Sequence, residues 1–136
     1  MPVRILIADD SPLVLSSVKS LLESHTNDWK ICAEATDGVQ TLGKALQARP
    51  DLIILDFQMP LMDGLRAFAR IVKALPHVPI LIYTIHKSPF LDAEAKKAGV
   101  RQVIAKPDTA ALVRAVSELL RKFPDPLVSR ETKNPA

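Results

Sequence analysis

Short apolar segments alternate with amphipathic segments along the whole chain. Each apolar segment is rich in Val, Ile or Leu and has the length of a β-strand. The first, third and fourth are almost continuously apolar, as expected of parallel strands covered on both faces, whereas the second is closer to alternation and suits an edge. The predicted strands cover residues 3–8, 29–35, 51–56, 79–84 and 101–105.

The segments between the strands carry apolar residues at helical spacing. Asp37 is a candidate N-cap, and Gly99 is a natural helix stop. The predicted apolar faces include Leu13 in the first helix, and Val39 and Leu46 in the second. The predicted helices cover residues 12–24, 38–49, 64–75, 89–98 and 109–123.

A strand–helix unit repeated in this way predicts an α/β fold with a doubly wound, five-stranded parallel sheet. Residues 1–123 are therefore interpreted as one domain. Residues 124–136 contain three prolines and few apolar residues, and they are interpreted as a C-terminal tail or a truncated linker.

Composition narrows the possible functions. The chain has 136 residues, 48% of them apolar, and a net charge of +3. Aromatic residues make up only 4%, which argues against direct nucleic-acid binding through stacking. The lone Cys32 cannot form an internal disulfide, and no apolar stretch approaches the roughly 18 residues of a membrane span. We expect a cytoplasmic protein without membrane contact.

Polar residues of complementary chemistry follow the predicted strands. Asp9 and Asp10 follow the first strand, and Asp56, Thr84 and Lys106 lie at the ends of later ones. Because parallel strands bring their carboxyl ends to one edge, we expect these side chains to surround one crevice. Adjacent carboxylates repel each other, and their oxygens are the ligands that Mg²⁺ prefers. The sequence therefore predicts a Mg²⁺ site.

This set of residues also predicts a reaction. A carboxylate can attack phosphorus and form an acyl phosphate, and Asp56 is the best nucleophile because it stands alone at a central strand. The Lys106 ammonium and the Thr84 hydroxyl are suited to contact the phosphoryl oxygens.

Four motifs in order carry a resemblance to a known family. They are ADD at 8–10, LDFQMPLMDG at 55–64, YT at 83–84 and AKP at 105–107. With these motifs the chain resembles the CheY-like receiver domain of two-component response regulators, with some likeness to receivers of the NarL kind. The resemblance implies a flavodoxin-like sheet with strand order 2-1-3-4-5.

The resemblance also implies roles for single residues. Asp56 is expected to accept a phosphoryl group from a sensor histidine kinase or a phosphotransfer protein. Mg²⁺ is expected to be held by Asp9, Asp10, Asp56 and the backbone carbonyl of Gln58, with Asp10 the more direct ligand and Asp9 acting through water. As an alternative, Asp10 is a candidate cap of the first helix.

The remaining expectations concern signalling. Thr84 is expected to move onto the phosphate and Lys106 to pair with it, and the bond from Lys106 to Pro107 is expected to be cis. Val103 stands where many receivers carry a Tyr or Phe. Signalling through rotation of that aromatic side chain is therefore in question. We expect three residues near Asp56 to set the lifetime of the phosphorylated state: Gln58, Ile85 and His86.

Other readings stay open. The chain is alternatively the receiver half of a longer NarL-type transcription factor, or a pseudo-receiver that binds partners without phosphorylation. An enzyme acting on external substrates is disfavoured, because Gln58 stands where aspartyl-phosphate hydrolases usually have a second catalytic aspartate. The downstream target is unidentified, and a homodimer through the face formed by residues 89–98, 101–105 and 109–123 is a further alternative.

Overall fold

The computed structural model describes residues 2–122 and confirms the alternation of strands and helices. The strands are β1 (Val3–Ala8), β2 (Trp29–Ala35), β3 (Leu52–Leu55), β4 (Ile80–Thr84) and β5 (Gln102–Ala105). The helices are α1 (Pro12–His25), α2 (Gly38–Ala48), α3 (Gly64–Ala74), α4 (Pro89–Ala98) and α5 (Thr109–Lys122). Phe123 and the predicted tail 124–136 lie outside the described residues.

All neighbouring strands in the sheet are parallel, and their order is β2-β1-β3-β4-β5. This confirms the predicted fold class and places β2 at an edge. The register positions the loops that follow the strands. Ala8 at the end of β1 is paired with Leu55 at the end of β3. The residues that follow them, Asp9 and Asp56, therefore leave the sheet side by side. Thr84 is paired with Ala105, which brings Lys106 to the same edge.

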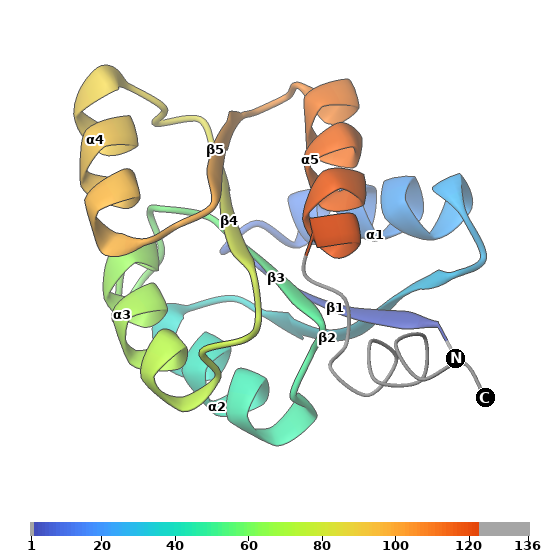
Figure 1. Ribbon diagram of the computed structural model, residues 1–136, viewed down its shortest axis with the longest axis horizontal. Coiled ribbons are helices and arrows are strands. Elements are labelled where there is room, and N and C mark those ends of the chain that lie inside the picture. The colour runs from blue at the N-terminus through green and yellow to red at the C-terminus, as the bar shows by residue number, and fades with distance from the viewer. Residues whose placement is uncertain (1, 123–136) are drawn as a thin grey trace, which may run out of the picture.

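Helices cover both faces of the sheet (Figure 1). On one face, α2, α3 and α4 bury residues such as Ala45, Phe68 and Ala95 against the strands. On the other face, α1 and α5 bury residues such as Leu22 and Val116. Burial on both sides explains why the central strands are continuously apolar. The removal of their apolar side chains from water stabilises the fold.

Local sequence fixes where helices begin and end. Ser11 caps α1 by accepting a hydrogen bond from the Val14 N–H at 3.3 Å. The alternative that Asp10 caps this helix is therefore wrong. Asp37 caps α2 as predicted, and Gly99 ends α4 with a left-handed φ of 100°, which glycine adopts without steric cost.

Some helix positions differ from the prediction. Leu13, Val39 and Leu46 were expected on apolar faces, but they are 77%, 51% and 43% exposed. The buried face of α1 instead contains Leu15, and that of α2 contains Thr41. The buried residues of α1 are Leu15, Val18 and Leu22, and at 3.6 residues per turn Leu13 lies on the opposite side of the helix. Within residues 2–122, no helix is long and apolar enough to span a membrane.

Candidate functional site

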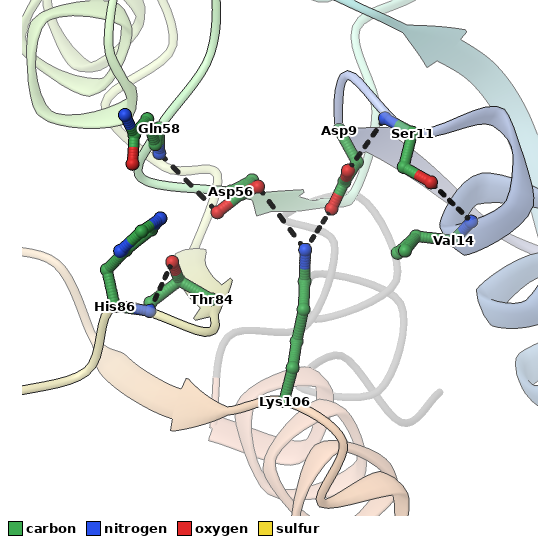
Figure 2. Close-up of polar contacts among 8 residues, drawn as sticks. All are labelled: Asp9, Ser11, Val14, Asp56, Gln58, Thr84, His86 and Lys106. Carbon is green, nitrogen blue, oxygen red and sulfur yellow. Dashed lines mark hydrogen bonds and ion pairs between the residues drawn. The ribbon is translucent and has the colours of Figure 1, made fainter.

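Acidic and basic side chains from three strand ends meet in one place (Figure 2). The Lys106 ammonium lies between two carboxylates and forms an ion pair with Asp9 and another with Asp56, the latter at 3.3 Å. These residues are up to 97 positions apart in sequence. The parallel topology therefore assembles the cluster that the strand ends predicted.

Asp9 is the more firmly held carboxylate. It is only 4% exposed, and its Oδ1 accepts the backbone N–H of Ser11 at 2.9 Å while its Oδ2 accepts from Lys106. A buried carboxylate needs such partners to offset the loss of water. The sequence predicted a positive charge near this aspartate but did not single out the pair with Lys106.

The surroundings of Lys106 keep it protonated. Burial alone lowers the pKa of its ammonium, but the hydrogen bond to Asp9 and the charge of Asp56 outweigh that effect, so the pKa lies above its ordinary value. The ammonium also lies 5.8 Å from the ring centroid of Tyr83. Burial raises the pKa of the Tyr83 phenol, although the Lys106 charge opposes the shift. A permanent positive charge therefore faces the two carboxylates.

The carboxylates of Asp9, Asp10 and Asp56 form a candidate cation site. Each offers an oxygen, and these oxygens all lie within 4.8 Å of one another. Asp10 is exposed, whereas the other two are buried. Three carboxylates beside one ammonium leave an excess of negative charge, and hard oxygen ligands with one side open to water suit Mg²⁺. The donor set therefore fits the predicted metal.

Two short loop contacts orient the remaining polar groups. The Gln58 N–H donates to Asp56 Oδ1 at 3.4 Å, and the His86 N–H donates to Thr84 Oγ1 at 3.1 Å. The Thr84 side chain is fully buried. Figure 2 shows Thr84 and His86 on the side of Asp56 away from Asp9. The Gln58 carbonyl as a metal ligand remains a prediction.

Two glycines hold the loop between β3 and α3 against the site. A Cβ added to Gly64 would lie 2.5 Å from the carbonyl oxygen of Asp56, and one added to Gly38 would overlap the carbonyl oxygen of Met62. The Gly38 N–H also donates to Pro60. The motif containing Gly64 was recognised in the sequence, but the role of Gly38 was not, because it depends on packing between α2 and this loop.

Of the residues predicted to tune the site, Gln58 and His86 make the backbone hydrogen bonds described above, and the other two differ in exposure. Ile85 is 71% exposed, and Val103 is half-buried beside α4. The peptide bond between Lys106 and Pro107 is cis. In the site, Asp9, Asp56 and Thr84 are buried and Lys106 is half-buried.

Comparison with known proteins identifies the family. Residues 5–117 match the response regulator receiver domain. This match covers most of the chain, which therefore belongs to that family, the receivers of two-component signalling.

Individual relatives agree. The chain is 33% identical over 129 residues to a protein-glutamate methylesterase/protein-glutamine glutaminase of Caldanaerobacter subterraneus, covering 94% of this chain but 34% of the relative. It is 29% identical to the chemotaxis protein CheY of Listeria monocytogenes, covering 88% of this chain and 98% of CheY. The signal receiver domain of NarL from Mycobacterium tuberculosis superimposes with a TM-score of 0.79 at 28% identity, covering 88% of this chain and 97% of that domain. The chain thus spans about a third of the methylesterase and nearly all of CheY.

Proposed function

We propose that this receiver is a phosphorylation switch whose acceptor is Asp56. The single observation that carries this proposal is the position of Lys106, whose ammonium contacts both Asp9 and Asp56 at the open edge of the sheet. The Asp56 carboxylate is thereby next to a cation that could also offset the charge of a transferred phosphoryl group. The donor is a phosphohistidine of a sensor histidine kinase or a phosphotransfer protein.

In the proposed reaction, an oxygen of the Asp56 carboxylate attacks phosphorus, and the bond from phosphorus to the histidine nitrogen breaks. The imidazole leaves with the electron pair of that bond, and an acyl phosphate forms on Asp56. Lys106 offsets the charge on the phosphoryl oxygens, and the Thr84 hydroxyl donates to one of them. The Thr84 oxygen already accepts from the His86 N–H, and the hydroxyl keeps its own hydrogen for donation to the phosphate.

We further propose that Asp9, Asp10 and Asp56 hold Mg²⁺ together with the Gln58 carbonyl. When bound, the metal supplies charge neutralisation for the phosphoryl oxygens. Asp10 is the exposed member of the acidic cluster, which suits a ligand that admits the cation from water. Asp9 already accepts from Ser11 and Lys106, which suits the more indirect role assigned to it.

The test is phosphorylation with a small-molecule donor. We expect the protein, incubated with acetyl phosphate and Mg²⁺, to gain the mass of one phosphoryl group, and Asp56→Asn to gain none. Asp28→Asn is a matched control, because Asp28 is an exposed aspartate at the opposite end of the strands. Chelation of Mg²⁺ should abolish the gain. An unmodified wild type with acetyl phosphate and with a phosphorylated kinase would support the pseudo-receiver alternative instead.

The output of the switch is a separate question. The likeness to the NarL receiver suits one alternative, in which this chain is the receiver part of a longer transcription factor, and the likeness to CheY along nearly its whole length suits a receiver that acts by itself. In either case the proposed activity is confined to the protein's own phosphorylation and dephosphorylation, in the cytoplasm, with a partner protein reading the phosphorylated state.

A further inference from the structure

The outer surface of α3 carries a row of positive charge. Arg66, Arg70 and Lys73 are spaced at i, i+4 and i+7, which places them on one side of the helix, and all three are exposed. Within the part of the chain that the structure describes, none of the three pairs with a carboxylate. This row is therefore a concentrated charge without a partner in the fold.

Of the two helices that pack against α3, α2 contains no Asp or Glu (Figure 1). The other, α4, contains Asp92 and Glu94, which pair with Lys87 and Lys97. The sequence also has no Asp or Glu from residue 64 to residue 91. The nearest acidic residue in sequence is Asp63, and its Oδ1 accepts the backbone N–H of Arg66 as the helix cap. The positive potential of this side of the molecule is consequently directed at solvent.

A groove with an apolar component runs along the same row. Its volume is about 500 Å³, and the three cations share its lining with Leu61, Met62 and Ala69.

The Leu61 side chain is 78% exposed, and its backbone adopts a left-handed φ of 69°. A residue with a large side chain seldom adopts that conformation, because the Cβ comes too close to a backbone carbonyl oxygen. The fold thus holds a large apolar side chain in water beside unpaired cations.

We propose that this groove is a docking site for an acidic, amphipathic segment of a partner protein. Carboxylates of the segment would pair with Arg66, Arg70 and Lys73, and its apolar residues would cover Leu61 and Met62. A helix is the segment that fits best, because acidic residues at i, i+4 and i+7 match the spacing of the cations.

The chemistry of the groove favours protein over nucleic acid. Among the described residues no aromatic side chain lines it, so these residues offer no surface on which bases would stack. Its exposed leucine matches an apolar residue better than a phosphate backbone. The proposal does not depend on phosphorylation of Asp56, because the cations and the groove lie outside the acidic cluster.

The test is an NMR titration of the isotope-labelled full chain with a synthetic helical peptide. The probe carries Glu at i, i+4 and i+7 on one side and Leu beside them. We expect saturable shifts confined to the β3–α3 loop and α3, and a roughly tenfold weaker affinity for the double variant Arg66→Glu and Arg70→Glu. Lys19→Glu, an exposed cation on α1, is the matched control and should bind as the wild type does.

Several results would overturn the proposal. One is the absence of saturable shifts, and another is an equal loss of affinity in Lys19→Glu, which would indicate nonspecific charge attraction. Tighter binding of a DNA oligonucleotide to the same groove would assign it to nucleic acid. Leu61→Ser separates the two components of the groove, since it should weaken binding while leaving the charge row intact. Thermal unfolding of each variant checks that the fold is retained.

Discussion

Lys106 balances the charge of the acidic site, but only in part. Its ammonium is shared by Asp9 and Asp56, so the nearby carboxylate of Asp10 adds negative charge that no cation among residues 2–122 pairs with. Repulsion between carboxylates is relieved when a cation binds or when one of them is removed. We therefore expect the site to lower the stability of the metal-free protein and to favour the binding of a cation.

Asp10→Asn should test this directly. Because Asp10 is exposed, its neutralisation should remove repulsion without leaving a buried charge unpaired. We expect the free energy of unfolding in urea, measured with a chelator, to increase by about 1 kcal/mol. Saturating Mg²⁺ should stabilise the wild type more than the variant. A variant that is less stable than the wild type under chelation would contradict this view of the cluster.

Ile85 is expected to shield the acyl phosphate from water. It directly follows Thr84 in the sequence, and it is exposed. With Ile85→Ala, the autodephosphorylation rate of the phosphorylated protein should rise, because water approaches phosphorus more easily. Leu46→Ala, an exposed apolar position far along α2, is the control. Equal rates in wild type and Ile85→Ala would remove Ile85 from this account.

Cys32 should be a slow nucleophile. Burial raises the pKa of its thiol, although the charge of Arg4 acts in the opposite direction. Since the thiolate is the reactive form, alkylation by iodoacetamide at mildly alkaline pH should be slower in the folded protein than in urea.

The same shift makes the stability depend on pH. The unfolded thiol loses its proton first as the pH rises, so the contribution of Cys32 to stability should fall above pH about 8.5. Cys32→Ser should lack this contribution. Faster alkylation of the folded protein than of the unfolded chain would contradict the shift.

At the scale of elements, the loop between β3 and α3 is built on a close backbone approach. Gly64 lies against the carbonyl of Asp56, whereas Gly43, in the middle of α2, has no neighbour within 4 Å of an added Cβ. Gly43→Ala should therefore raise the free energy of unfolding by about 0.5–1 kcal/mol through helix propensity.

Gly64→Ala should have the opposite effect, because its Cβ cannot be placed without moving the Asp56 backbone. We expect lower stability and slower phosphorylation by acetyl phosphate in this variant. Gly43→Ala and Gly64→Ala both add one methyl group. The difference between their unfolding curves therefore measures the effect of the close approach between Gly64 and the Asp56 carbonyl. Equal stability of the two variants would show that the loop can relax around a Cβ.

The elements themselves were predictable, because their apolar spacing and caps are local properties of the sequence. The exposure of Leu13 was missed because α1 has apolar residues on more than one side, and the predicted face was centred away from Leu15, Val18 and Leu22, the residues that are buried. The left-handed conformation of Leu61 could not be predicted from the sequence either, since residues other than glycine, asparagine and aspartate seldom adopt it.

At the scale of the whole molecule, the parallel topology explains why the strand-end residues meet. Alternation of elements predicts a parallel sheet, and hence one edge for Asp9, Asp56 and Lys106. Alternation does not fix the strand order, which came from the resemblance to receivers. Nor does it decide which carboxylate pairs with Lys106, because that depends on side-chain geometry at the sheet edge.

The central claim is that Asp56 accepts the phosphoryl group, and chemical trapping tests it most directly. Borohydride reduces an aspartyl phosphate to homoserine, and peptide mass spectrometry then locates the change. After incubation with acetyl phosphate and Mg²⁺, homoserine should appear at position 56 and at no other aspartate. Homoserine at position 9 or 10, or none after treatment with acetyl phosphate and with a phosphorylated histidine kinase, would contradict the account.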